Sequence, residues 1–151
     1  MLFRSEKELD AIQEIDANEY MEILPKEYIN YTLETNKNYN KYDDMVLDCE
    51  DKLWQENRSN KKKYGTDFKI VYEVQSEVLY KDDKDLSELT EKYNNKYDST
   101  AKIEEAAKAT VITEVKAADA VGNSTISEMC FIKIDGTWYL DIDNITNLLA
   151  E

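Results

Sequence analysis

The sequence contains no histidine and has few cysteines, glycines and prolines. Its 151 residues include two cysteines, three glycines and one proline. Without histidine, the chain cannot supply the commonest general base or the commonest transition-metal ligand. This absence excludes a Ser-His-Asp triad, a Cys-His pair and any histidine-containing zinc site built from this chain alone.

Basic side chains are also few. The chain carries 19 Lys and Arg residues against 33 Asp and Glu residues, and its formal net charge is −14. A nucleic-acid-binding protein needs a basic face to displace counterions from phosphates, and docking on anionic lipid needs the same. We therefore expect no nucleic-acid partner. The acidity has two interpretations: it keeps the protein soluble, or it mimics nucleic-acid charge and attracts a basic protein.

Long apolar runs are missing as well. No stretch is long enough to span a membrane, so we expect no direct membrane insertion. The segment Met1–Glu6 lacks the apolar region of a signal peptide. Removal of a leader would leave the same sequence, so an extracytoplasmic or secreted location and a cytoplasmic location both stay open.

Helical patterns dominate the first part of the chain. Apolar spacing predicts three helices, over residues 6–15, 19–34 and 45–60. Ser5 and Glu8 have the spacing of a capping box at the start of the first helix. Pro25 either kinks the second helix or restarts it. Lys61–Lys63 and Gly65 are typical of the end of the third helix, because its dipole favours cations and glycine accepts a left-handed conformation.

Strand patterns dominate the second part. Apolar and polar residues alternate from Asp67 to Tyr80, which predicts a long strand with one buried face and one wet face. A short helix is predicted next, from about Asp82 to Tyr97. A second strand is predicted over Ala106–Ala118, and Val121–Asn123 supplies a turn after it.

A hairpin near the C-terminus gives the strongest local signal. Two apolar runs, Ile126–Ile134 and Thr137–Ile142, flank the pair Asp135 and Gly136. An Asp-Gly pair is typical of a type I′ turn, which needs positive φ at both central residues. We expect this hairpin to close an antiparallel meander, with the helices covering one face of the sheet.

This order of elements resembles the NTF2-like (cystatin-like α+β) superfamily, in particular small domains of unknown function in secreted proteins and lipoproteins of Gram-positive bacteria. The similar segments are residues 12–33, 68–80 and 131–143, the last containing Gly136-Thr137-Trp138-Tyr139-Leu140. The resemblance implies one α+β domain over residues 1–151. In it, N-terminal helices pack on a curved, mostly antiparallel sheet of about four strands, often around a conical pocket. Enzymes of the superfamily use either an Asp with a Tyr or an Asp-His pair. This chain has no histidine, so it cannot form the Asp-His pair.

Aromatic side chains are the most visible chemical feature. Eight of them can line a small-molecule pocket or fill the core: Tyr20, Tyr28, Tyr31, Trp54, Tyr72, Tyr80, Trp138 and Tyr139. Within the pocket interpretation, Tyr72 and Trp138 are the best candidates for ligand binding. Both lie in the middle of predicted strands, on faces that we expect to point inward.

Cys49 and Cys130 allow one further prediction. Cys49 lies on the apolar stripe of the third helix and Cys130 lies in the middle of a strand, so a helix packed on the sheet would let them meet. They form either one disulfide bond or two buried thiols. The clustered carboxylates lack the glycine and the ligand series of a calcium loop, so we expect no metal and no cofactor.

These observations predict a non-enzymatic binding or interaction domain with a small-molecule or protein ligand, as a monomer or a dimer. The alternative is a small acidic inhibitor, such as a toxin-immunity protein or a nucleic-acid mimic. An enzyme would need an Asp or Glu beside a Tyr inside a closed pocket.

Overall fold

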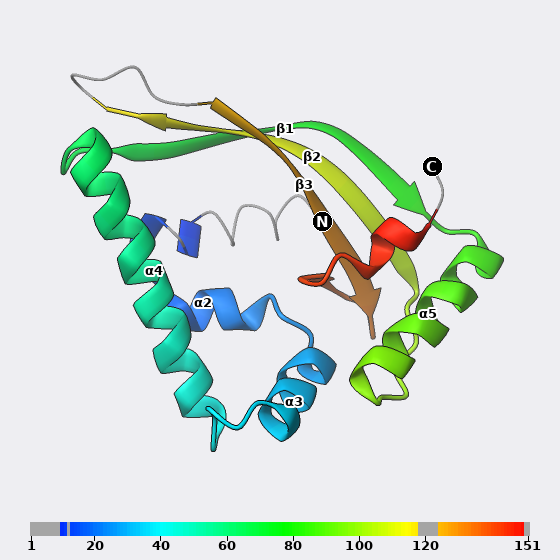
Figure 1. Cartoon of the computed structure of the whole chain (residues 1–151). Helices are drawn as coiled ribbons and strands as arrows, with labels where there is room; N and C mark the ends of the chain where they lie inside the picture. The colour runs from blue at the N-terminus through cyan, green and yellow to red at the C-terminus, as the bar shows by residue number, and fades with distance from the viewer. Residues whose placement is uncertain (1–9, 12, 118–123, 150–151) are drawn as a thin grey trace.

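The computed structural model describes residues 10–11, 13–117 and 124–149, and these form an α+β fold (Figure 1). The longer elements are the helices α2 (Ala17–Glu22), α3 (Lys26–Thr35), α4 (Tyr42–Tyr64) and α5 (Asp83–Tyr97), and the strands β1 (Lys69–Tyr80), β2 (Glu105–Lys116), β3 (Ser124–Ile134) and β4 (Thr137–Leu140). A short 3₁₀ helix, η1 (Ile145–Leu148), follows. The predicted fold class, helices packed on a sheet of about four strands, is confirmed.

The N-terminal helices follow the predicted order. Ser5 and Glu8 lie outside the described residues, as does half of the predicted first helix, whose described residues Asp10, Ala11, Gln13 and Glu14 are helical. The predicted second helix is two helices, because Pro25 stands in an extended conformation between α2 and α3 and the chain restarts after it. The side chain of Asp16 caps α2 by accepting a hydrogen bond from the Glu19 N–H at 3.0 Å.

Helix α4 extends beyond the predicted range at both ends. Its start is fixed by Asp44, whose carboxylate accepts hydrogen bonds from the backbone N–H groups of Asn40 and Lys41 at 2.8 and 3.1 Å. Its end has the predicted form, with Lys61–Lys63 in the last turn and Gly65 at a φ of 94°. No helix in the described part of the chain is long and apolar enough to cross a membrane.

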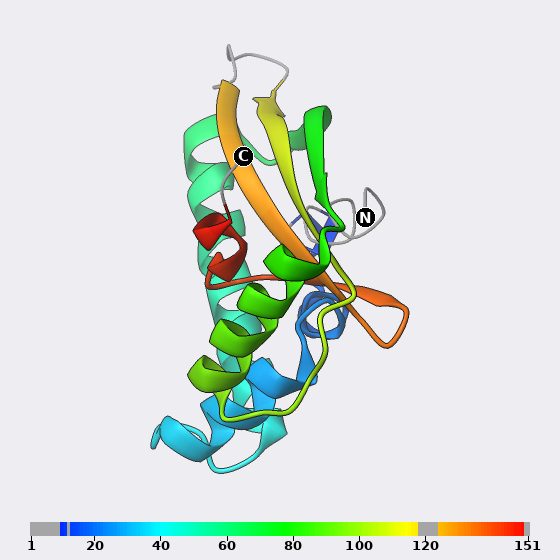
Figure 2. The same ribbon diagram turned by 90° about the vertical axis from the view of Figure 1, so that its right-hand side faces the viewer.

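The four strands form one antiparallel sheet in the order β1-β2-β3-β4. The hairpin turn has the predicted type, since Asp135 and Gly136 have φ values of 51° and 78°. The predicted turn at Val121–Asn123 lies outside the described residues. Strand β1 runs from the C-terminal end of α4 to the N-terminal end of α5 (Figure 1), and in Figure 2 α5 lies in front of α4.

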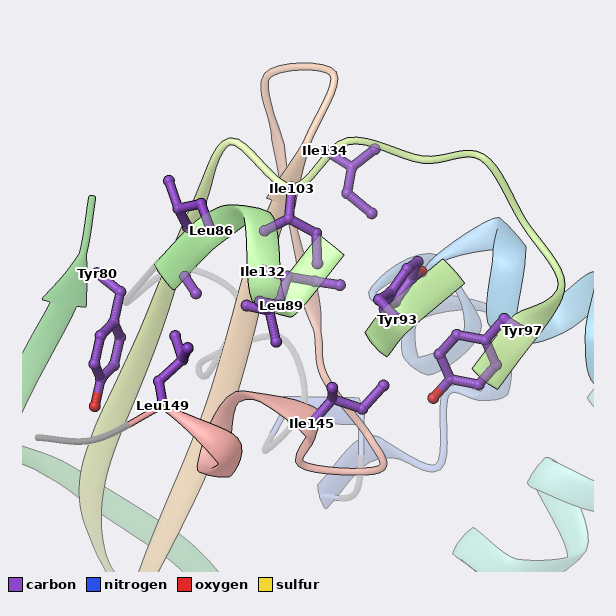
Figure 3. Close-up of a cluster of buried hydrophobic side chains, with 11 residues drawn as sticks. Tyr80, Leu86, Leu89, Tyr93, Tyr97, Ile103, Ile132, Ile134, Ile145 and Leu149 are labelled. Atoms are coloured by element: carbon purple, nitrogen blue, oxygen red, sulfur yellow. The ribbon is translucent and has the colours of Figure 1, made fainter. Parts of the chain in front are cut away.

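The sheet is buried on both faces at the end near α5, contrary to the prediction of one covered face. Neighbouring residues of a strand point to opposite faces, and Phe131 and Ile132 of β3 are both fully buried. Phe131 belongs to a cluster that we call the α4-side core: Met21, Ile23, Leu24, Met45, Ala107, Ala109, Val111, Phe131 and Leu140. Ile132 belongs to the α5-side core: Tyr80, Leu86, Leu89, Tyr93, Tyr97, Ile103, Ala106, Ile132, Ile134, Ile145 and Leu149 (Figure 3).

Strand β1 does not keep the single buried face that its alternating sequence predicts. The register shifts between Val74 and Ser76, so that one residue of β1 has no partner on β2. Such a bulge exchanges the two faces of the strand. Tyr72 and Val74 therefore pack against the α4-side core, whereas Tyr80 lies in the α5-side core.

Candidate functional site

A cavity of about 360 Å³ lies where α2, α3 and α4 meet, which is within the usual size range of small-molecule pockets. Its lining comes mostly from helices. The residues that line it are Tyr20, Met21, Leu24, Tyr28, Tyr39, Met45, Asp48, Cys49, Lys52, Leu53, Glu56 and Ile142.

The floor of the cavity is apolar. Met45, Cys49 and Leu53 are spaced four residues apart on α4, so they share the face that turns toward α2. Met21 and Leu24 approach from the other side, and both are almost fully buried. Methionine side chains adapt to irregular shapes, so a floor with two of them can adjust to a ligand.

The rim of the cavity is polar. Asp48, Lys52 and Glu56 are also spaced four residues apart on α4, one position away from the apolar stripe. The Tyr39 hydroxyl donates a hydrogen bond to Asp48 Oδ2 at 2.5 Å. Lys52 Nζ lies 3.1 Å from the same carboxylate oxygen. Tyr39 stands in the connection between α3 and α4, so this contact ties that connection to the helix.

These contacts determine the protonation of the rim. The hydrogen bond to Asp48, together with burial, raises the pKa of Tyr39 from 10.0 to about 12. The same bond, followed by the contact with Lys52, lowers the pKa of Asp48 below its ordinary value. Burial raises the pKa of the Cys49 thiol. At neutral pH the cavity therefore presents a protonated tyrosine and an ionised carboxylate at its rim, and a protonated thiol on its floor.

We expect the Tyr39–Asp48 bond to make stability depend on alkaline pH. A group whose pKa is higher in the folded state stabilises the fold below its unfolded value, and that contribution disappears as the pH rises through the folded value. Tyr39→Phe should lower the unfolding free energy by about 1 kcal/mol at neutral pH. Urea unfolding should show this difference shrinking between pH 10 and about 12.

Tyr42→Phe is the matched control, because this tyrosine is 41% exposed at the start of α4. It should change stability by less than about 0.5 kcal/mol at neutral pH. A deficit for Tyr39→Phe that stays constant to pH 12 would contradict the proposed role of the bond.

The two predicted ligand-binding aromatics do not come together. Tyr72 is on β1 and Trp138 is on β4, which are the two edges of the sheet. Through the strand register, Tyr72 stands beside Thr113 and Trp138 is in line with Glu105. These positions on β2 are roughly 26 Å apart at ~3.3 Å per residue. Both rings are partly buried against the α4-side core, and neither lines the cavity. They cannot share one small-molecule pocket.

The predicted disulfide is absent, since Cys49 and Cys130 are both free thiols. Cys49 lies at the cavity on the α4 side of the sheet. Cys130 is paired with Lys108 on the other face, where its thiol lies 3.5 Å from Asn147 Oδ1. Of the two alternatives, the disulfide bond is wrong because it assumed one covered face, which would have brought both residues to the same side.

The remaining aromatics are divided between core and cavity. Tyr80 is buried in the α5-side core, with Tyr31 and Tyr139 packed against it, whereas Trp54 is 46% exposed. Tyr20 and Tyr28 line the cavity together with Tyr39, which the sequence did not single out. The sequence did contain a signal for the rim of the cavity, because Asp48, Lys52 and Glu56 repeat every four residues beside the apolar stripe of α4.

Two other tyrosines also donate to carboxylates. The Tyr93 hydroxyl donates to Glu27 Oε1 at 3.1 Å and the Tyr97 hydroxyl donates to Asp143 Oδ2 at 2.5 Å. Burial is the main cause that raises the pKa of both tyrosines. Within the described ranges, no group of three or more His, Cys, Asp or Glu residues is arranged to hold a metal ion.

Comparisons with known proteins gave no relative: no family model, curated protein or solved structure matches this chain.

Proposed function

We propose that this chain is a non-enzymatic binding domain whose ligand site is the cavity between α2, α3 and α4. The observation that carries this proposal is an apolar floor with a polar rim in a cavity of about 360 Å³. The order of helices and meander supports an NTF2-like domain, and the resemblance favours an extracytoplasmic or secreted protein. Fractionation of cells that produce the protein would test the compartment.

The chemistry of the rim supports binding rather than catalysis. A general base works best with a pKa near the operating pH, whereas contacts with Tyr39 and Lys52 lower the pKa of Asp48. A nucleophilic cysteine needs a lowered pKa, whereas burial raises that of Cys49. Both groups are therefore poorly prepared for proton transfer or nucleophilic attack.

Cys49 provides a test of the site without any added label. Cys130 is only 1% exposed, so iodoacetamide should modify Cys49 first in the folded protein. A small-molecule library would be screened by thermal shift, and each hit would then be tested for slowing this modification. A ligand of the cavity should slow it in proportion to its occupancy.

Two substitutions on α4 make the test specific. Cys49→Phe fills the cavity, and hits should lose their thermal shift in this variant. Leu47→Phe is the matched control, because Leu47 is two residues away on the outer face and is 61% exposed. Hits that bind equally well to Cys49→Phe, or a library without any hit, would overturn the cavity as a ligand site.

A second candidate, an inhibitor of a basic protein, is favoured by the outer face of α4. Leu47 and Trp54 are seven residues apart and are 61% and 46% exposed, with the carboxylates of Glu50 and Asp51 beside them. Arg58 also lies beside Trp54, but the two carboxylates exceed its charge, and an excess of carboxylates around exposed apolar residues complements a basic surface, such as that of a nuclease. Purified basic nuclease domains should bind the protein, and Trp54→Ala should weaken binding at least tenfold. Unchanged binding by this variant would remove α4 as the interface.

A further inference from the structure

We infer that the ligand of the cavity between α2, α3 and α4 is a small organic cation with an apolar body. This inference rests on the proposed function and adds the chemical class of the ligand. The apolar body follows from the floor, where Met21, Met45 and Leu53 are almost fully buried and offer no hydrogen-bonding group. The charge of the ligand follows from the rim.

The charged groups of the rim favour a cation. Asp48 and Glu56 supply two carboxylates, and among the described residues of the lining only Lys52 supplies an ammonium group. Lys52 contacts Asp48 at 3.1 Å and its side chain is 72% exposed, so it is already paired and points toward solvent. Glu56 forms no ion pair with any residue of the described chain, so its carboxylate is available to a bound ammonium group.

The aromatic rings of the lining favour the same charge. Tyr28 and Tyr39 line the cavity, and a cation that reaches the face of a tyrosine ring is attracted to it. The Tyr39 hydroxyl donates its hydrogen bond to Asp48, so its oxygen can act only as an acceptor toward a ligand. An ammonium group donates hydrogen bonds, so it suits this arrangement better than a carboxylate or phosphate does.

The net charge of the whole chain also favours a cationic ligand. A net charge of −14 attracts cations to any cleft and repels anions. An anionic ligand would share its positive partner, Lys52, with Asp48 and would be repelled by that carboxylate. A neutral ligand would fill the floor but would gain no attraction from the carboxylates of Asp48 and Glu56.

Three probes with one body separate these possibilities. 4-Phenylbutylamine, 4-phenylbutanol and 5-phenylpentanoate share the phenylbutyl body and differ only in the head group, which is cationic, neutral or anionic at pH 7. The readout is the concentration of each that halves the rate of Cys49 modification by iodoacetamide in the full chain. The amine should protect at a concentration about 3- to 30-fold lower than the alcohol, and the carboxylate should protect least.

Glu56→Gln should remove most of the advantage of the amine over the alcohol while leaving protection by the alcohol unchanged. Glu50→Gln is the control, because this carboxylate lies on the outer side of α4 and does not line the cavity. Equal protection by all three probes would keep the cavity as a binding site and overturn the cationic ligand, as would better protection by the carboxylate. Protection by none of them would overturn both proposals.

Discussion

Asp141→Ala should lower the unfolding free energy by about 3 kcal/mol. This carboxylate is 2% exposed, directly after β4. Its Oδ2 accepts two hydrogen bonds from Thr146, one from the backbone N–H and one from the hydroxyl, both at 2.7 Å. Alanine would leave both donors buried without an acceptor and would release η1, which carries Ile145 of the α5-side core.

Denaturant unfolding of two further variants would identify the cause of this loss. Asp141→Asn keeps an acceptor oxygen in a side chain of the same size, so it should lower the unfolding free energy clearly less than Asp141→Ala does. Glu88→Ala removes an exposed carboxylate from α5 and should change stability by less than about 0.5 kcal/mol. A loss below about 1 kcal/mol for Asp141→Ala would show that its two hydrogen bonds with Thr146 contribute little to the fold.

Local signals in the sequence predict most elements of this fold. The alternation over 67–80 corresponds to β1, and Asp82 caps α5 by accepting from the N–H groups of Lys84 and Asp85. The Asp135 and Gly136 pair predicts the turn between β3 and β4. These features are encoded within a few neighbouring residues, so reading the chain in short windows is enough to find them.

The assignment of residues to faces could not be predicted in the same way. The bulge between Val74 and Ser76 has no glycine or proline to mark it, and it exchanges the faces of β1. The burial of β2 on both faces depends on α5 and η1, which pack on it from other parts of the chain. The disulfide alternative for Cys49 and Cys130 failed for this reason.

The candidate site depends on the same tertiary information. Tyr72 and Trp138 are aromatic residues in strands, and nothing in their local sequence indicates that they lie at opposite edges of the sheet. The cavity is formed where α2, α3 and α4 cross, a geometry that Pro25 makes possible by separating α2 from α3. The sequence shows which polar residues α4 carries, but it does not show that α2, α3 and α4 come together beside them.

Phe131→Ala and Ile132→Ala should each lower the unfolding free energy by more than about 2 kcal/mol, as large-to-small changes do in a filled core. Both side chains are 0% exposed, and they belong to cores on opposite faces of β3. Ile126→Ala is the matched control, because Ile126 shares the strand and the face of Ile132 but is 68% exposed. This change should lower the unfolding free energy by less than about 1 kcal/mol. A sheet covered on one face would give a large loss for only one of the two neighbours. Denaturant unfolding with a large loss for one and a loss below about 1 kcal/mol for the other would contradict the two-sided core.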